Sequence, residues 1–245
     1  MKNRLDVFLT EQNLVRSRNV AKDLIINKKV SVNNKIIDKP NYLVNDTDNV
    51  FIIENEKYVS RAAYKLLAAI ENFNLDLNNK NVIDIGSSTG GFSQVLLENK
   101  INHLYCIDVG TDQLDQSIRS KENVTVYENT NFKDVTPNMF FYDINFITID
   151  VSFTSIQPIL LKIKNFFKQN IKIVALLKPQ FELGKQIIKN KGFVKPKEQL
   201  KIIEDFKYFC SLNNFKILNY INSPILGAKK NNQEFLFYLE LVNDK

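Results

Sequence analysis

Apolar residues between positions 58 and 245 alternate between helical spacing and short continuous runs. The continuous runs cover 81–86, 103–109, 123–128, 144–150 and 171–178. The helical patterns cover 60–73, where Ser60 can open the helix, 91–100, 153–167 and 197–213. Runs with so few polar positions are typical of parallel strands that helices cover on both faces. The pattern therefore predicts an α/β domain with a doubly wound sheet.

Two further apolar runs, at 215–221 and 234–242, follow the last helical pattern. They are close enough in sequence to form an antiparallel pair, which we expect at the edge of the sheet. Seven strands that end in such a pair resemble the Rossmann-like sheet of class I S-adenosylmethionine-dependent methyltransferases.

The first 57 residues have a separate pattern with shorter elements. The predicted elements are two helices, 5–9 and 18–28, a hairpin over 29–37 and a strand over 48–54. Ser17 can cap the second helix, and Asn33-Asn34 can adopt the positive φ of a tight hairpin turn. We therefore expect two domains, 1–57 and 58–245.

Positive charge is concentrated in two segments. Residues 1–35 hold eight Lys and Arg against three acidic residues, and residues 178–201 hold seven Lys against two Glu, so each segment has a net charge of +5. Because the whole chain has a net charge of +6, the remainder is acidic. Two separate basic segments indicate a polyanionic partner, with nucleic acid as the leading candidate and a solvated lysine surface as the alternative.

Several classes of protein are disfavoured. Cys106 and Cys210 are the only cysteines and lack metal-ligand spacing, so we expect neither a disulfide framework nor a bound metal. The first residues include acids where a secretory signal requires an apolar centre, and no run approaches the ~18 apolar residues of a membrane span. We therefore expect a cytoplasmic protein that does not enter membranes.

A glycine-rich turn, DIGSSTGGF, follows the first strand of the larger domain. The dinucleotide fingerprint is G-x-G-x-x-G, in which the second glycine allows the backbone to approach a pyrophosphate closely. Here Ser87-Ser88 stand in place of that glycine. This replacement disfavours NAD and FAD. S-adenosylmethionine carries no phosphate and requires a tight turn with acids for its amine and ribose hydroxyls. Asp84 beside the turn and Asp108 at the end of the second strand can supply these acids.

Four charged residues lie at places where a doubly wound sheet gathers its ligand. Asp150 ends the fourth strand, Lys178 ends the fifth, Glu234 opens the last strand, and Lys65 lies on the small apolar side of the first helix. The carboxyl ends of parallel strands converge on one crevice, so we expect the four charges to meet there.

Other methylation chemistries fit less well. The segment Asp150-Val151-Ser152-Phe153 lacks the prolines of base amino-methylases. Both cysteines have the pattern of core residues, which disfavours the cysteine nucleophile of cytosine-C5 methylases. His103, the only histidine, precedes a strand and is expected at the surface, so histidine base catalysis is disfavoured.

The chain resembles the TlyA family of rRNA methyltransferases, in which an S4 RNA-binding domain precedes an FtsJ-like domain. The motifs that carry the second part are YVSRAAYKL, DIGSSTGGFSQVLL, IDVGTDQL, ENTNF, IDVSF, LLKPQFELGK and QEFLFYL. The S4 resemblance rests on Arg4-Leu5-Asp6, Ser17-Arg18, Ala21, Leu24-Ile25, Val30, Val32-Asn33-Asn34, Lys39-Pro40 and Asp48. Two departures are Ala62-Ala63, where many members have glycines, and Asn131, which aligns with an aspartate that holds adenine.

The resemblance implies ribose 2′-O-methylation of rRNA, at cytidines in one or both ribosomal subunits, with S-adenosylmethionine as methyl donor. The catalytic tetrad would be Lys65, Asp150, Lys178 and Glu234. The cofactor-binding residues would be Asp84, Gly86, Ser87, Ser88, Thr89, Gly90, Gly91, Phe92, Asp108, Val109, Asn131 and Asp150. The RNA-binding residues would be Arg4, Arg16, Arg18, Lys22, Lys28 and Lys29, with Arg18 and Lys22 projecting from one side of the second helix.

A lysine base must be deprotonated, and lysine's reference pKa of ~10.4 disfavours this at neutral pH. Positive charge on Lys65 and on the cofactor's sulfonium would disfavour protonation of Lys178, which we expect to be the base. Lys65 would steady the developing oxyanion, and the carboxylates would position the lysines. The alternatives are a non-catalytic RNA-binding or ribosome-assembly factor, a membrane-active haemolysin, and a methylase for a small molecule.

Overall fold

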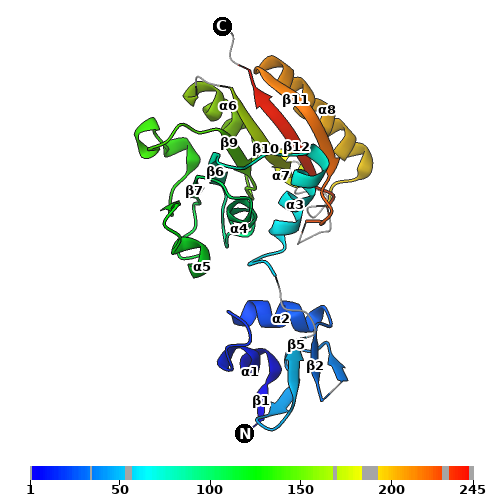
Figure 1. The fold of residues 1–245 in the computed structure, drawn as a ribbon. Helices are drawn as coiled ribbons and strands as arrows, with labels where there is room; N and C mark the ends of the chain where they lie inside the picture. The colour runs from blue at the N-terminus through cyan, green and yellow to red at the C-terminus, as the bar shows by residue number, and fades with distance from the viewer. Residues whose placement is uncertain are drawn as a thin grey trace. The chain divides into compact units, whose positions relative to one another are not determined.

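The computed structural model describes residues 2–33, 35–52, 57–167, 170–183, 193–227 and 232–242. Its contacts divide the chain into two compact units, Met1–Lys57 and Tyr58–Lys245 (Figure 1). None of the helices in the described ranges combines the length and the apolar character that crossing a bilayer requires.

The smaller unit packs two helices against short strands. In chain order these are β1 (Lys2–Arg4), α1 (Leu5–Glu11), α2 (Arg18–Ile26), β2 (Val30–Val32), β3 (Lys35–Ile37), β4 (Leu43–Asn45) and β5 (Val50–Ile52). Strands β3-β2-β5 form an antiparallel sheet, and β1 pairs with β4. Ser17 Oγ accepts a hydrogen bond from Val20 N at 3.4 Å, so the predicted cap of α2 is confirmed. Asn33 has a φ of 51° in the hairpin turn, whereas Asn34 lies outside the described residues.

The larger unit is built on a seven-stranded sheet with the order β11-β12-β10-β9-β6-β7-β8. Its strands are β6 (Asn81–Ile85), β7 (His103–Ile107), β8 (Val124–Tyr127), β9 (Phe146–Ile149), β10 (Ile171–Leu177), β11 (Phe215–Asn222) and β12 (Phe235–Leu241). Strands β6 to β10 are parallel, and β12 runs antiparallel between β10 and β11. The predicted seven-stranded sheet and its terminal antiparallel pair are confirmed.

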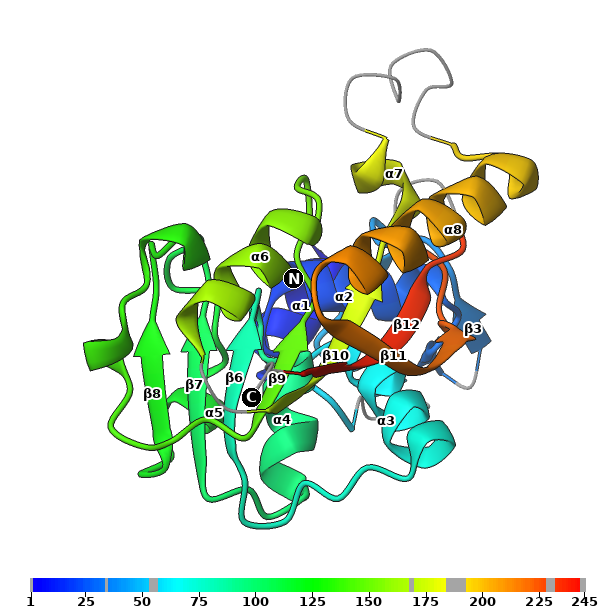
Figure 2. The same ribbon diagram turned by 90° about the horizontal axis from the view of Figure 1, so that it is seen from above.

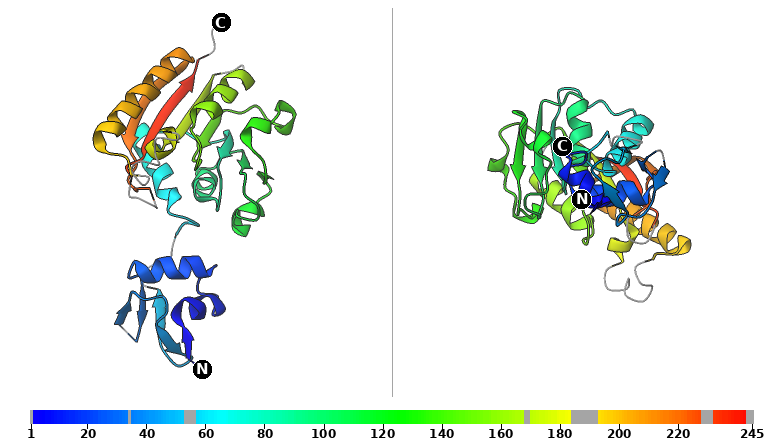
Figure 3. Two further views of the ribbon diagram at one scale, coloured as in Figure 1. Left: turned by 180° about the vertical axis from the view of Figure 1, so that it is seen from behind. Right: turned by 90° about the horizontal axis from the view of Figure 1, so that it is seen from below.

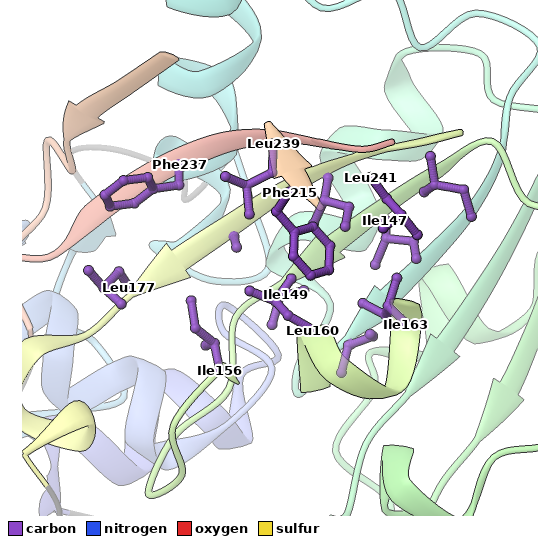
Figure 4. Packing of buried hydrophobic residues seen from close by; sticks show 14 of the residues in the cluster. Ile147, Ile149, Ile156, Leu160, Ile163, Leu177, Phe215, Phe237, Leu239 and Leu241 are labelled. Carbon is purple, nitrogen blue, oxygen red and sulfur yellow. The ribbon is translucent and has the colours of Figure 1, made fainter. Parts of the chain in front are cut away.

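Helices cover both faces of this sheet (Figure 2). One face packs against α3 (Ala62–Phe73), α4 (Gly91–Glu98) and the short α5 (Gln116–Arg119). The other packs against α6 (Gln157–Phe166) and α8 (Pro196–Leu212), and α8 lies along β11 (Figure 3, left). Leu160 and Ile163 of α6 meet Ile147 and Ile149 of β9 in this core, where Phe237 of β12 also lies (Figure 4). This double cover explains why the strand sequences are so apolar.

The strand order reverses between β6 and β9. The backbone segments that follow these two strands lie in close contact. Gly86, which follows β6, has a φ of +83°, and a Cβ atom on it would lie 2.4 Å from the carbonyl oxygen of Asp150, which follows β9. Only glycine fits this contact. In open α/β sheets, such a switch point is where ligands bind.

Two predicted helix starts are wrong. Helix α3 begins at Ala62, and its N-cap residue is Arg61 without a side-chain cap, rather than Ser60. Helix α6 begins at Gln157 rather than near Phe153. Phe153 has a φ of +65°, which a helix cannot include, and Pro158 favours a helix start just before it. Residues 151–156 therefore form a loop after β9.

Candidate active site

Two ion pairs lie at the carboxyl edge of the sheet. Lys65 Nζ is 2.7 Å from Glu234 Oε2, and Lys178 Nζ is 2.6 Å from Asp150 Oδ1. Lys65, Lys178 and Glu234 are 9%, 8% and 2% exposed, so these charges are held away from solvent. Buried charges persist only when they are paired, and the two pairs satisfy this condition.

The strand register places the two pairs side by side. Ile149 of β9 lies opposite Ala175 of β10, and Leu177 of β10 lies opposite Phe235 of β12. Asp150, Lys178 and Glu234 are therefore at the ends of three neighbouring strands, and α3 supplies Lys65 to Glu234. The structure thus brings the four predicted residues to one edge of the sheet, and their catalytic role remains a prediction.

The Lys178–Asp150 contact is an ion pair without the alignment of a hydrogen bond. Lys178 Nζ donates a hydrogen bond of 3.0 Å to Ser152 Oγ instead. The ammonium group of Lys178, 2.6 Å away, compensates the charge on Asp150 Oδ1. Each carboxylate oxygen can accept more than one hydrogen bond, so a ligand's donor could still bind Asp150.

A pocket of about 640 Å³ opens at the switch point beside Asp150. Six of the predicted cofactor-binding residues line it: Gly86, Ser88, Asp108, Val109, Asn131 and Asp150. Its other walls include Ile85, Ile107 and Phe132, which supply apolar surface, and the loop residues Val151 to Thr154. The other predicted cofactor-binding residues, Asp84, Ser87, Thr89, Gly90, Gly91 and Phe92, do not line it.

Asp108 is held in place by the backbone of two turns. Its Oδ2 accepts a hydrogen bond from Ser88 N at 2.8 Å, and its Oδ1 accepts one from Gly110 N at 2.7 Å. Each carboxylate oxygen can accept a second hydrogen bond, so Asp108 can still bind hydroxyl donors in the pocket.

The structure does not support direct contact between Asp84 and a cofactor. Asp84 is 0% exposed, and its two carboxylate oxygens accept hydrogen bonds from Ser93 Oγ at 2.6 Å and Thr148 Oγ1 at 2.8 Å. Burial raises the pKa of Asp84 to about 6, and the two hydroxyls oppose that rise. Its carboxylate lies beneath the glycine-rich turn, inside the protein.

The turn's later residues also serve packing. Gly91 starts α4, and a Cβ atom on it would lie 2.2 Å from Ser60 Oγ. Phe92 is 3% exposed and belongs to the core on the α3 and α4 face. Gly91 and Phe92 therefore pack against neighbouring elements, whereas Gly86 and Ser88 are the residues of the turn that line the pocket.

Asn131 lines the pocket but already has a structural task. Its Oδ1 accepts a hydrogen bond from Lys133 N at 3.1 Å and caps the 3₁₀ turn Phe132–Asp134. A carbonyl oxygen has two lone pairs, so one more donor, such as an adenine amino group, could be accepted.

Sequence reasoning missed four residues of the site: Ser152, Phe153, Gln180 and Glu182. Gln180 lies on the short α7 (Pro179–Glu182) and donates from Nε2 to Glu234 Oε1 at 3.4 Å. Glu182 on the same helix accepts hydrogen bonds from Ser155 Oγ and Ile156 N. All four lie in the segments IDVSF and KPQFE, which follow strand ends. Sequence reasoning assigned a role in these segments only to the charged residues at the strand ends, Asp150 and Lys178.

Comparison with known proteins identifies both units. The FtsJ-like methyltransferase family matches residues 58–241, and the S4 domain matches residues 3–50. The chain is an FtsJ-like methyltransferase. It is 36% identical over 257 residues to the 23S rRNA (cytidine-2'-O)-methyltransferase TlyA of Campylobacter jejuni, across 97% of this chain and 99% of that protein.

Two other relatives agree with this membership. Hemolysin A of Brachyspira hyodysenteriae is 36% identical over 242 residues, across 93% of this FtsJ-like chain and 96% of the relative. The solved structure of a candidate hemolysin from Streptococcus thermophilus superposes with a TM-score of 0.77 at 36% identity, across 99% of this chain and 91% of that one. The predicted resemblance to the TlyA family is confirmed.

The predicted RNA-binding arginines of this methyltransferase's S4 unit also support its fold. Asp6 is 0% exposed, and its carboxylate accepts hydrogen bonds from Arg4 Nε at 2.9 Å and Arg18 Nε at 3.0 Å. Burial alone would raise the pKa of Asp6, but the two guanidinium groups outweigh it and lower that pKa below its ordinary value. The side chains of Arg4 and Arg18 remain 44% and 51% exposed, so contact with RNA stays a prediction.

The remaining RNA-binding candidates are Arg16 and Lys28, which are exposed, and Lys22 and Lys29, which are partly exposed. Part of the second basic segment, residues 184–192, lies outside the described residues. Its RNA contact therefore also stays a prediction.

The residues predicted to be inert have positions consistent with that reading. Cys106 and Cys210 are 0% exposed, and burial raises the pKa of both thiols, to about 12 for Cys210. His103 is only partly exposed, lies against Tyr105 and Tyr142, and bonds Thr125 Oγ1, so the expectation of a simple surface residue is incomplete. Within the described ranges, no three His, Cys, Asp or Glu side chains cluster as metal ligands would.

Proposed function

We propose that this FtsJ-like methyltransferase transfers a methyl group from S-adenosylmethionine to a ribose 2′-hydroxyl of rRNA, with Lys178 as general base. The observation that carries the proposal is the ion pair of 2.6 Å between Lys178 Nζ and Asp150 Oδ1, because Asp150 also lines the switch-point pocket. Relatives named as rRNA (cytidine-2'-O)-methyltransferases support a cytidine substrate, in one or both ribosomal subunits.

The pocket suits this cofactor in size and chemistry. Small-molecule sites usually have volumes of ~300–1,000 Å³, and this one has about 640 Å³. Asp108 would accept hydrogen bonds from the ribose hydroxyls, and Ile107 and Phe132 would contact the adenine with Asn131 near its amino group. Asp150 would face the positive sulfonium. When bound, S-adenosylmethionine supplies an electrophilic methyl group.

The residues of the site would position and deprotonate the hydroxyl. The Asp150 carboxylate would accept a hydrogen bond from the 2′-hydroxyl and hold it beside Lys178 Nζ, which would take the proton. A cationic group in the pocket favours the neutral form of the nearby amine. Lys65, fixed by Glu234, would stabilise the negative charge that develops on the oxygen.

The S4 unit would recruit the substrate by contacts to the phosphates and shape of structured rRNA. Such a substrate places the activity in the cytoplasm. If this unit recruits rRNA, deletion of 1–57 should abolish transfer to rRNA. If the enzyme instead methylated a small molecule, the same deletion should leave its activity intact.

The proposal is tested with tritiated S-adenosylmethionine and rRNA from cells that lack the gene, followed by mass spectrometry of the nucleosides. The wild type should produce a 2′-O-methylated nucleoside, and Lys178→Met should lower the rate by ~10²–10⁴-fold, the usual contribution of a general base. Lys172→Met, on the exposed start of the same strand, is the matched control and should leave the rate unchanged.

Calorimetry then separates catalysis from architecture. If Lys178→Met binds S-adenosylmethionine as the wild type does, the lost rate reports proton transfer. If binding is lost as well, Lys178 is a structural residue and the assignment of the base is wrong. A methyl group found on a base instead of a ribose would refute the proposed reaction.

A further inference from the structure

Glu182 carries a carboxylate that the proposed reaction does not use. It ends α7, does not line the switch-point pocket, and forms no ion pair with any residue in the described ranges. Burial raises the pKa of Glu182 above its ordinary value, and hydrogen bonds to the carboxylate oppose that rise. Removing a carboxylate from water without a counter-ion costs free energy, so the contacts that hold it there require an explanation.

The contacts of Glu182 fix the start of α6. Its Oε2 accepts a hydrogen bond of 2.5 Å from Ser155 Oγ, and its Oε1 accepts one of 3.0 Å from Ile156 N. Ser155 Oγ in turn accepts a hydrogen bond of 3.1 Å from Gln157 N. Ile156 is the N-cap residue of α6, and its own side chain provides no cap. Glu182 therefore supplies, from another element, the negatively charged acceptor that stabilises a helix start.

The same short segment also holds the other end of the loop between β9 and α6. Lys178, four residues before Glu182, pairs with Asp150 and donates a hydrogen bond of 3.0 Å to Ser152 Oγ. Residues 178–182 therefore attach to the loop at both of its ends, and the loop residues 151–154 between these attachments line the pocket. Phe153 in this stretch has a φ of +65°, a strained conformation that persists only where the surroundings fix it.

We propose that Glu182 is a positioning residue, which holds this loop against the segment of Lys178 so that Asp150 and Lys178 stay aligned for methyl transfer. The inference rests on the proposed function, in which these two residues bind and deprotonate the 2′-hydroxyl. Without the carboxylate, the loop loses its attachment to α7, and the pocket wall that follows Asp150 can move relative to the amine. A misplacement of reacting groups by about 1 Å can lower a rate by ~10²-fold.

The test compares Glu182→Ala and Glu182→Gln in methyl transfer from tritiated S-adenosylmethionine to rRNA from cells that lack the gene. Rates at saturating substrates are divided by the number of S-adenosylmethionine-binding sites, which calorimetry counts, so that unfolded protein does not lower the result. Glu182→Ala should lower kcat per site by roughly tenfold to a hundredfold. The KM for rRNA should stay unchanged, because the S4 unit recruits the RNA. Glu182→Gln should retain most of the rate, because its amide can still accept from Ile156 N and donate to Ser155 Oγ.

Ser155→Ala tests the same contact from the other side. It removes one of the two hydrogen bonds to Glu182, so kcat per site should fall, but by less than in Glu182→Ala. The double variant should be no slower than Glu182→Ala alone, because two residues that act through one contact have non-additive effects. If Glu182→Ala does not fold, Ser155→Ala carries the test by itself.

Glu198→Ala is the matched control. Glu198 Oε2 also accepts a backbone hydrogen bond at a helix start, 2.9 Å from Lys195 N, but this residue does not line the pocket. It should leave kcat per site unchanged. If Glu182→Ala or Ser155→Ala is as fast per site as the wild type, or if Glu182→Gln is as slow as Glu182→Ala, the positioning role is wrong while the methyltransferase function stands. If the wild type itself transfers no methyl group to rRNA, both proposals fail.

Discussion

The buried carboxyl group of Asp84 should make the larger unit less stable as pH rises through mild acidity. Its pKa is raised from 3.8 to about 6, chiefly because burial penalises the charged form. Between these values the folded protein keeps the proton on Asp84 and the unfolded chain does not. Since the folded state then binds more protons, the free energy of unfolding falls as pH increases. A shift of about two pKa units corresponds to a loss of about 3 kcal/mol, complete near pH 7.

Asp84→Asn isolates this contribution because asparagine has the same shape and does not titrate. Its absolute stability depends on whether Ser93 and Thr148 can reorient their hydroxyls toward the amide, so the informative quantity is the difference from wild type at each pH. Between pH 4 and pH 7, the wild type should lose about 3 kcal/mol relative to Asp84→Asn. Ser93→Ala removes a donor that favours the ionised carboxylate, so it should make the loss larger.

The measurement is urea unfolding at a series of pH values, followed by near-ultraviolet circular dichroism of tyrosine. Eight of the nine tyrosines lie in 58–245, so the signal reports the larger unit. Asp205→Asn, an exposed aspartate on α8, should run parallel to the wild type. Parallel curves for Asp84→Asn and wild type would refute the reasoning, because they would mean that Asp84 titrates alike in the folded and unfolded states.

Further expectations concern the two other buried acids. Lys65→Met and Glu234→Gln should each destabilise the larger unit by about 3–5 kcal/mol, because each leaves the other residue's buried charge without a partner. The double variant should lose less free energy of unfolding than the two single variants lose together. Strictly additive free energies of unfolding would show that the pair is not coupled. Arg18→Ala should lower the melting temperature of the S4 unit because it removes a partner of Asp6, whereas Lys22→Ala should only weaken rRNA binding and its salt dependence in filter-binding assays. Equal melting temperatures for Arg18→Ala and Lys22→Ala would contradict the structural role of Arg18.

The apolar pattern predicted the order and type of the main elements because buried parallel strands are unusually uniform in sequence. It did not place the short strands β1 and β4, because β1 continues directly into α1 and β4 lies outside the hairpin that the Asn33-Asn34 turn marks. It also placed the start of α6 too early, because nothing in the apolar spacing marks the positive φ of Phe153. That loop shapes the pocket, so the error affected the site more than the fold.

Charge at strand ends predicted the position of Asp108, Asp150, Lys178 and Glu234, because the topology forces those ends together. The same reasoning misjudged Asp84, which points into the protein rather than out of the turn. Direction of a side chain depends on tertiary contacts such as those with Ser93 and Thr148. Sequence spacing contains no record of these contacts.

The position of β12 has a consequence for biosynthesis. It is the last strand in chain order, yet it lies between β10 and β11, and Glu234 directly precedes it. While the polypeptide emerges from the ribosome, β10 and β11 have no partner on their facing edges, and Lys65 has no counter-ion. The sheet therefore cannot be completed until this strand has inserted between β10 and β11, and a premature stop shortly before Phe235 would leave two open strand edges.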